Sequence, residues 1–191
     1  SSTVSVNTTS GFSVVSYTGT GSNATIGHGL GSVPKMLIVK NRNSIENWRV
    51  YHASLGNTKE IYLDTTNASV TSSTTWNNTT PTSSVFSVGT VHGTNKSSDT
   101  YIAYCFAEKK GYSKFGSYTG NGNANGTFVY TGFLPAWVLI KQSSASGEEW
   151  QLLDNKRNTF NSTNTALFPS GSAAENSGND RLDFLSNGFK C

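Results

Sequence analysis

The chain is poor in charged residues, cysteine, methionine and proline. Only 13% of its 191 residues are charged, and it contains two cysteines, one methionine and four prolines. Two cysteines are too few for a disulfide framework, so we expect the core alone to hold the fold. Long apolar runs are also missing: no stretch approaches the ~18 residues of a membrane-spanning helix, and we expect no insertion into a membrane.

Motifs for nucleic-acid binding and for catalysis are missing as well. The formal net charge is +3, but no run of basic residues exceeds Lys109-Lys110. Nucleic-acid-binding proteins usually carry a basic stripe, so we expect no nucleic-acid partner. The sequence has no HxH, HExxH or CxxC spacing, no GxSxG elbow and no GKS or GKT. We therefore predict no metal, no cofactor and no catalytic residue, and hence a protein that is not an enzyme.

What the chain has in abundance is residues that favour strands and turns. It contains 19 glycines, 12% of its residues are aromatic, and Ser, Thr and Asn are frequent throughout. Short apolar runs such as PKMLIVKN and TYIAYCFAE alternate with Gly- and Asn-rich segments. Regularly spaced short strands separated by turn residues predict an all-β protein of the β-sandwich or jelly-roll kind.

The sequence also contains an internal repeat. Residues 16–40 align with residues 117–141. The pairs Tyr17/Tyr118, Gly19/Gly120 and Pro34/Pro135 each lie 101 residues apart, and the pair Trp48/Trp150 lies 102 apart. Because whole phosphate-binding loops are rarely duplicated with their surroundings, we interpret these glycines as turn residues.

The repeat predicts two tandem β-sandwich or jelly-roll-like units that are related by internal duplication. The first spans 11–108 and the second 111–191, after an N-terminal polar segment or extra strand at 1–10. The second unit lacks its last strand, because nothing in it matches 100–108. Either the polypeptide is an excerpt or a processed product, or another chain supplies the missing strand, for example through residues 2–7.

Tryptophan and glutamate positions give the remaining candidates. We predict that the duplicated Trp48 and Trp150 fill the two cores and that Trp137 packs in a core or between the units. Trp76 lies in a long Asn- and Thr-rich loop, so it is the candidate for contact with a sugar ring or a partner; the alternative is that it anchors the loop. Glu46 and Glu148 are the one carboxylate pair that could serve glycoside hydrolysis, but as equivalent residues of two repeats we expect them to lie far apart.

Specific motifs also point to a family. SYTGNG, a proline before an apolar strand that ends in lysine, and YIAYCFAE together resemble a repeated domain of uncharacterised function in virion proteins of marine phages, particularly phages of cyanobacteria. The resemblance implies a non-enzymatic structural or adhesive virion component, in a tail fibre or on the capsid exterior. By the habit of that family, it implies a homo-oligomer. On this interpretation the chain is located on the virion and contacts other virion proteins, and host-surface glycans are its candidate ligand. The alternatives are a self-assembling extracellular filament or surface-layer subunit, and a polysaccharide depolymerase.

Overall fold

The structure is a computed structural model that describes residues 2–178 and 180–191, and it is nearly all-β, as predicted. The described residues form fourteen strands and one four-residue helix, α1 (His92–Asn95). The strands of the first half are β1 (Ser2–Asn7), β2 (Phe12–Thr18), β3 (Ala24–Gly27), β4 (Pro34–Asn41), β5 (Arg49–His52), β6 (Lys59–Tyr62), β7 (Val70–Thr71), β8 (Val85–Val88) and β9 (Thr100–Ala107). Those of the second half are β10 (Phe128–Tyr130), β11 (Trp137–Ile140), β12 (Gln151–Asp154), β13 (Asp183–Leu185) and β14 (Gly188–Lys190).

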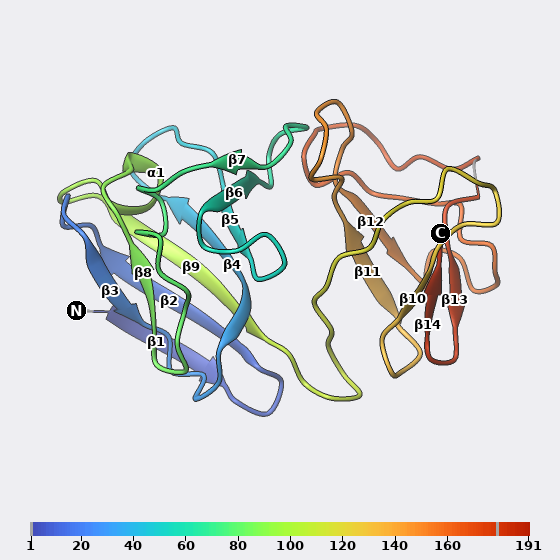
Figure 1. The fold of residues 1–191 in the computed structure, drawn as a ribbon, viewed down its shortest axis with the longest axis horizontal. Coiled ribbons are helices and arrows are strands. Elements are labelled where there is room, and N and C mark those ends of the chain that lie inside the picture. The colour runs from blue at the N-terminus through green and yellow to red at the C-terminus, as the bar shows by residue number, and fades with distance from the viewer. Residues whose placement is uncertain (1, 179) are drawn as a thin grey trace.

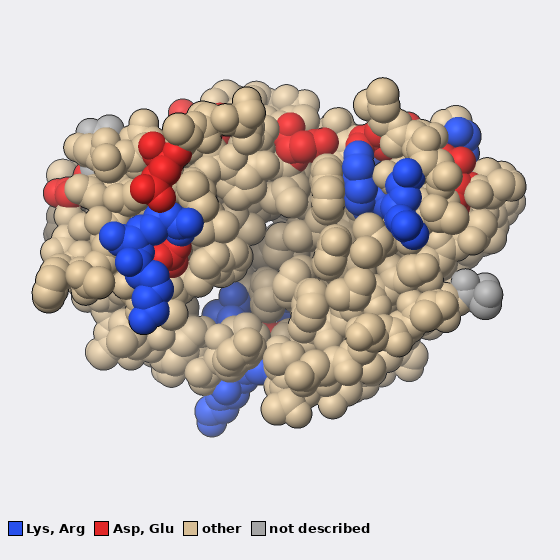
Figure 2. All heavy atoms as spheres, turned by 180° about the vertical axis from the view of Figure 1, so that it is seen from behind, with Lys and Arg blue, Asp and Glu red and all other residues tan. Residues whose placement is uncertain are grey.

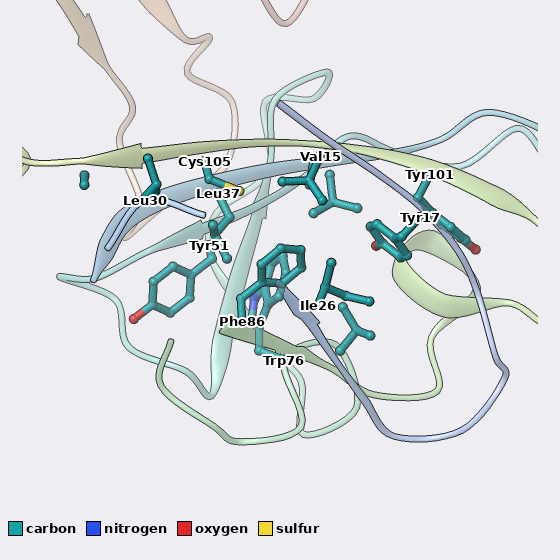
Figure 3. Close-up of a cluster of buried hydrophobic side chains, with 14 residues drawn as sticks. Val15, Tyr17, Ile26, Leu30, Leu37, Tyr51, Trp76, Phe86, Tyr101 and Cys105 are labelled. Atoms are coloured by element: carbon teal, nitrogen blue, oxygen red, sulfur yellow. The ribbon is translucent and has the colours of Figure 1, made fainter. Parts of the chain in front are cut away.

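The first half is a two-layer sandwich with a large core. Its main sheet is antiparallel, with the strand order β1-β2-β9-β4-β5-β6-β7. The antiparallel pair β3–β8 covers one face of this sheet (Figure 1). Along β9, residues alternate strictly between half-buried and buried, which is the period of a strand with one face on a core. The side chains that point inward from both layers form one cluster, shown in Figure 3.

Residues 2–7 form a strand of the chain's own sheet. As β1, they pair antiparallel with β2 from Ser2 opposite Tyr17 to Asn7 opposite Phe12. The segment that we considered as a donor to another chain therefore lies at the edge of its own main sheet.

The second half is smaller and its sheets are shorter. It contains the hairpin β11–β12, the three-stranded sheet β10-β14-β13 and several isolated bridges. Its core is a cluster of six buried residues: Val138, Leu153, Ala166, Leu182, Phe184 and Phe189. Less apolar surface is buried here than in the first half, so less hydrophobic stabilisation is available to it.

Trp150 joins the two halves. The side chain is 4% exposed and packs with Met36, Val50 and Ile61, which lie on the outer face of the main sheet. Its indole Nε1 donates a hydrogen bond to the Tyr62 carbonyl oxygen at 2.7 Å. The prediction that Trp150 fills the second core is therefore wrong. Its position before β12 aims it across the interface, where the first half supplies the larger apolar surface.

Backbone hydrogen bonds add to this junction. The Ser69 N–H donates to the Ser143 carbonyl at 2.9 Å, and the Gly147 N–H donates to the Thr66 carbonyl at 3.0 Å. The two halves are thus held by a buried indole and by loop-to-loop hydrogen bonds, in addition to the connecting chain.

One hairpin occurs in both halves with the same register. In β4–β5, Met36 lies opposite His52, and in β11–β12, Trp137 lies opposite Asp154. All four residue pairs of β11–β12 are pairs of β4–β5 displaced by 101 residues in the first strand and 102 in the second. These are the offsets by which the sequence itself aligns. The surroundings differ, because β4 also pairs with β9, whereas among residues 2–178 and 180–191 β11 pairs with β12 alone.

Candidate binding surface

Exposed apolar side chains are concentrated in the second half. Of the eleven exposed large hydrophobic residues that the structure describes, seven lie between positions 112 and 160. They are Tyr112, Tyr118, Phe128, Tyr130, Leu134, Trp137 and Phe160. Single exposed apolar residues are normal on a protein surface, so the informative ones are exposed aromatic side chains that lie side by side.

Strand β10 presents two of these rings on one face. Phe128 is 46% exposed and Tyr130 is 65% exposed, while Val129 between them packs against the second core, as strand alternation requires. Gly188 of β14 lies opposite Tyr130, and a Cβ there would lie 2.1 Å from the Val129 carbonyl oxygen and 3.0 Å from the Phe128 ring. The glycine thus leaves room for Phe128 to lie over β14, and Lys190 flanks the two rings from the same sheet face.

A hollow of about 210 Å³ lies beside the second core. Ile140 and Leu153 form its apolar part, and Tyr118, Glu148 and Arg181 are among the polar residues around it. The Arg181 Nη1 donates a hydrogen bond to the Gln151 Oε1 at 3.2 Å, and the guanidinium lies 5.7 Å from the centre of the Phe168 ring. Burial raises the pKa of the Tyr118 hydroxyl, and the neighbouring Cys191 adds to the shift.

Trp76 is buried in the first core and is unavailable for contact with a ligand. Its side chain is 1% exposed and meets the Tyr51 ring edge-on at a centroid separation of 5.9 Å (Figure 3). The indole Nε1 donates a hydrogen bond to the Lys59 carbonyl oxygen at 3.1 Å. The prediction that Trp76 contacts a sugar or a partner is therefore wrong. The alternative, that Trp76 anchors its loop, agrees with the structure. The polar sequence around it conceals this role because the loop folds over the sandwich.

Trp48 and Trp137 also differ from expectation. Trp48 is half-buried beside the outer face of the main sheet, where its ring is nearly parallel to that of Tyr104, with centroids 6.4 Å apart. The Lys40 ammonium lies 5.8 Å from the Trp48 ring centre. Trp137 is 53% exposed. The predictions that Trp48 fills a core and that Trp137 is packed are therefore wrong, since repeat position alone does not say which side of a sheet a side chain takes.

The positions that the repeat singles out are buried in the first half more often than in the second. Tyr17 is 3% exposed, whereas its counterpart Tyr118 is 38% exposed. Gly19 is likewise buried and Gly120 exposed. Pro34 and Pro135 are both buried; Pro34 is the first residue of β4, and Pro135 lies two residues before β11.

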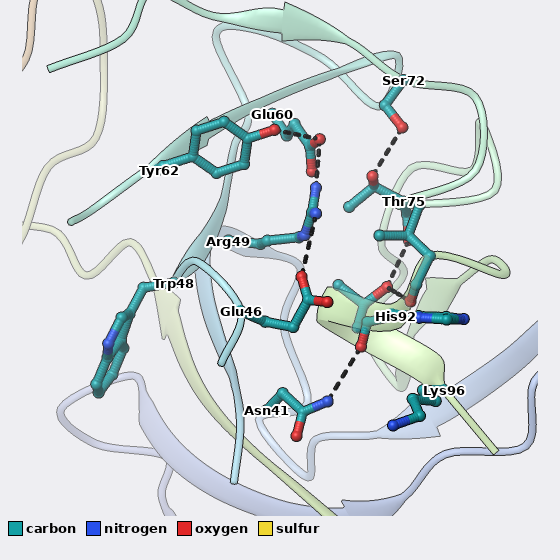
Figure 4. Close-up of polar contacts among 12 residues, drawn as sticks. Asn41, Glu46, Trp48, Arg49, Glu60, Tyr62, Ser72, Thr75, His92 and Lys96 are labelled. Atoms are coloured by element: carbon teal, nitrogen blue, oxygen red, sulfur yellow. Dashed lines mark hydrogen bonds and ion pairs between the residues drawn. The ribbon is translucent and has the colours of Figure 1, made fainter. Parts of the chain in front are cut away.

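Glu46 belongs to a cluster of charged side chains in the first half (Figure 4). Arg49 Nη1 donates a hydrogen bond to Glu60 Oε1 at 2.6 Å, and its Nη2 lies 3.7 Å from Glu46. Glu60 is 3% exposed and also accepts a hydrogen bond from the Tyr62 hydroxyl at 3.1 Å. Burial acts to lower the pKa of Arg49, but the hydrogen bond and the charge of Glu60, with Tyr62 and Glu46, outweigh it and the pKa is raised.

Glu46 and Glu148 belong to different surroundings. Glu46 flanks the buried pair of Arg49 and Glu60, while Glu148 borders the hollow of the second half. The two carboxylates have different neighbours, and among the described residues they do not line a common cleft.

Comparison with protein families shows which family the chain belongs to. The family described as a domain of unknown function (DUF7483) matches residues 1–191. The chain belongs to this family. Comparisons with curated proteins and with solved structures find no match. The description of the family names no activity.

The DUF7483 domain carries few charged side chains on its surface. Figure 2 shows one face of the molecule, on which basic and acidic side chains form small mixed groups on a largely uncharged surface. Among residues 2–178 and 180–191, no three His, Cys, Asp or Glu side chains gather in a way that could hold a metal ion. In the same part of the chain, no helix is long and apolar enough to cross a membrane.

Proposed function

We propose that this chain is a non-catalytic structural and adhesive module of an extracellular particle, a phage virion, and that its second half makes the adhesive contact. The observation that carries the proposal is the concentration of exposed aromatic side chains between positions 112 and 160. The first half, with its complete sandwich core, serves as the scaffold.

Host-surface glycans are the ligand class that this surface fits best. Phe128 and Tyr130 offer two ring faces to the apolar side of a sugar, and Lys190 beside them can donate hydrogen bonds to hydroxyl groups. A shallow platform of this size binds each sugar weakly. A homo-oligomer that presents several copies would raise the overall affinity through avidity.

The sequence resemblance to phage structural proteins supports the proposed virion setting. A surface that is rich in Ser, Thr, Asn and Gly and low in charge is well hydrated and suits a particle exposed to solvent. We place the chain in a tail fibre or on the capsid exterior, with other virion proteins as partners.

We also infer that the two halves arose by tandem duplication. Two observations support this inference: the 101- and 102-residue offsets of the sequence repeat, and the hairpins β4–β5 and β11–β12, which pair in registers related by the same offsets. The large sheet of the first half and the short sheets of the second would then represent divergence from a common unit.

The adhesive role is tested by removing the two rings of β10. The double variant Phe128→Ala/Tyr130→Ala should lose at least tenfold in apparent affinity for an array of bacterial surface polysaccharides and for host cells. Ile45→Ala in the first half is the matched control, because Ile45 is fully exposed and its loss removes apolar surface elsewhere. Equal binding by the wild type and the double variant, or failure of the wild type to bind any polysaccharide on the array, would refute glycan adhesion through β10.

A further inference from the structure

An apolar pocket of about 280 Å³ lies where the chain leaves the main sheet and runs to the second half (Figure 1). Phe12 of β2 and Phe106 of β9 are paired across the two strands, and their ring centroids lie 5.0 Å apart. Phe115 lines the pocket from the connecting segment, with its ring 6.3 Å from that of Phe106. Three phenylalanine rings thus line a pocket on the outer face of the main sheet.

A tight turn holds Tyr112 at the edge of this pocket. The Tyr112 and Ser113 N–H groups donate to the Lys109 carbonyl at 3.0 and 2.9 Å, and the Lys109 N–H donates to the Ser113 carbonyl at 3.2 Å. Gly111 provides the left-handed conformation that the turn needs, with a φ of +76°. Tyr112 lines the pocket and is nevertheless 66% exposed. The turn therefore presents this ring to a binding partner in a fixed backbone conformation.

The serine hydroxyls of the pocket form hydrogen bonds within the chain. Ser10 Oγ donates to the Asn7 carbonyl at 3.4 Å, and Ser113 Oγ donates to the Ala107 carbonyl at 3.4 Å. A sugar, whose hydroxyl groups need several polar partners, therefore finds few donors here, and the pocket favours an apolar group. Its volume is just below the roughly 300 Å³ at which sites for whole small molecules begin, so a single aromatic side chain suits it.

The rim of the pocket is basic. Between Glu108 and Lys114 the chain carries three lysines and one glutamate, a net charge of +2, whereas the whole chain carries +3. Glu108 is compensated, because it accepts a hydrogen bond from Lys114 Nζ at 2.8 Å. Lys109 and Lys110 form no ion pair with any described residue. A Cβ at Gly11, which lines the pocket, would lie 3.0 Å from Cγ and Cε of Lys109, so this lysine crosses the pocket's edge. Acidic groups beside an apolar one would complement this rim.

We propose that the pocket is a docking site for an acidic segment of a partner protein, which inserts one aromatic side chain against the three phenylalanine rings. Asp and Glu residues on either side of the inserted ring meet the lysines of the rim, and Tyr112 covers the ring from the solvent side. Aromatic anchors in such pockets supply much of the affinity of an interface, and opposite charges speed the encounter and select the partner. The docking site goes beyond the adhesive role of β10.

A second copy of this chain does not have the required chemistry. Among the described residues, no exposed aromatic residue other than Tyr112 has an Asp or Glu within four positions of it in the sequence. The most exposed of these rings, Phe160, instead follows Lys156 and Arg157. We therefore expect the acidic segment to belong to a different protein.

Titration with peptides tests the docking site. The probes are GEDWDEG, GEDFDEG and GEDYDEG, each added to the whole 191-residue chain and followed by heteronuclear NMR. At least one should bind saturably, with one peptide per chain, and should shift the amide signals of Gly11, Tyr112 and Ser113. The matched peptides GEDADEG, which lacks the ring, and GQNWNQG, which lacks the charges, should each bind at least tenfold more weakly.

Two variants of the chain assign the binding to this pocket. Tyr112→Ala removes an exposed ring and Lys110→Glu reverses a charge of the rim, so both should fold normally and bind at least tenfold more weakly. Phe160→Ala and Lys156→Glu are the matched controls, because they make the same changes at exposed positions of the second half, and both should bind like the wild type. Circular dichroism checks that all four variants fold.

Three results would overturn the proposal: no binding of any ring-bearing peptide, equal binding of the ring-bearing and ring-free peptides, or wild-type binding by both Tyr112→Ala and Lys110→Glu. If the chain instead self-associates and Tyr112→Ala keeps it monomeric, the occupant is a second copy and the proposal fails. Binding to phosphatidylglycerol vesicles without binding of any peptide would also overturn it.

The docking site and the adhesive surface can be tested separately. Phe128 and Tyr130 do not line the pocket, so the double variant Phe128→Ala/Tyr130→Ala should keep peptide binding. Tyr112→Ala should in turn keep glycan binding. Failure of the docking proposal and failure of the proposed adhesive function are therefore distinguishable.

Discussion

Removing the indole of Trp150 should separate the second half from the first. The side chain is 4% exposed, and its neighbours Met36, Val50 and Ile61 would be left facing a large void. Truncation of a buried tryptophan to alanine typically costs about 3–5 kcal/mol. The same change also removes the hydrogen bond from the indole to the Tyr62 carbonyl, and the loss of such a bond accounts for about 1 kcal/mol of this cost. We therefore expect Trp150→Ala to lower the free energy of unfolding by about 3–5 kcal/mol.

The assay is urea unfolding followed by circular dichroism and tryptophan fluorescence. Trp150→Phe keeps most of the apolar contact but cannot donate the hydrogen bond, so it should cost less than Trp150→Ala. Trp137→Ala is the matched control, because Trp137 is 53% exposed and its loss should change stability by about 0.5 kcal/mol or less. A loss of under about 1 kcal/mol for Trp150→Ala would refute the junction as described, since burial of the indole would then contribute little.

Three further predictions concern the first half. Trp76→Phe should lower stability by about 1–3 kcal/mol, since it removes a buried ring and the donor to a backbone carbonyl; calorimetry checks this, and an unchanged melting temperature would contradict burial of Trp76. Gly93→Ala should cost about 1–3 kcal/mol in urea unfolding, because the new Cβ would lie 2.0 Å from the buried Arg49 Nε; wild-type stability would show that Arg49 is not packed there. Burial lowers the pKa of His28, and its Nδ1 accepts a hydrogen bond from the Leu30 N–H at 3.2 Å, so the folded state favours the neutral ring. The stability that depends on neutral His28 is complete above the ordinary pKa of about 6.5 and is lost as the pH falls below it. The free energy of unfolding measured from pH 8 to 5 should therefore decrease with falling pH, and His28→Gln should make this decrease smaller. An equal decrease in the wild type and the variant would contradict the assignment.

Strand content could be predicted because it rests on local pattern. Alternation in TYIAYCFAE and the apolar run PKMLIVKN correspond to β9 and β4, since period-2 burial depends on neighbours along the chain. The offset at which the sequence aligns with itself also relates the registers of the hairpins β4–β5 and β11–β12, while the duplication itself stays a prediction.

The destination of individual tryptophans could not be predicted in the same way. A polar loop gives no sign that Trp76 folds back onto the sandwich, and a duplicated position gives no sign that Trp150 crosses to the other half. Such choices depend on which apolar surface is larger and nearer in three dimensions. The exposure of the aromatic pair on β10 could not be predicted either, because FVY is apolar throughout and the sequence does not say which face of the strand meets solvent.

The central claim is that β4 of the first half pairs on both sides whereas, within the described residues, β11 of the second half pairs with β12 alone, and hydrogen exchange of the free chain tests this difference most directly. The amides of Met36 and Ile38, which face β9, should be strongly protected. Those of Trp137 and Leu139, at the equivalent positions of β11, should exchange faster by more than about a hundredfold. Equal protection at the two pairs of positions would contradict the account, because it would mean that the edge of β11 is already closed.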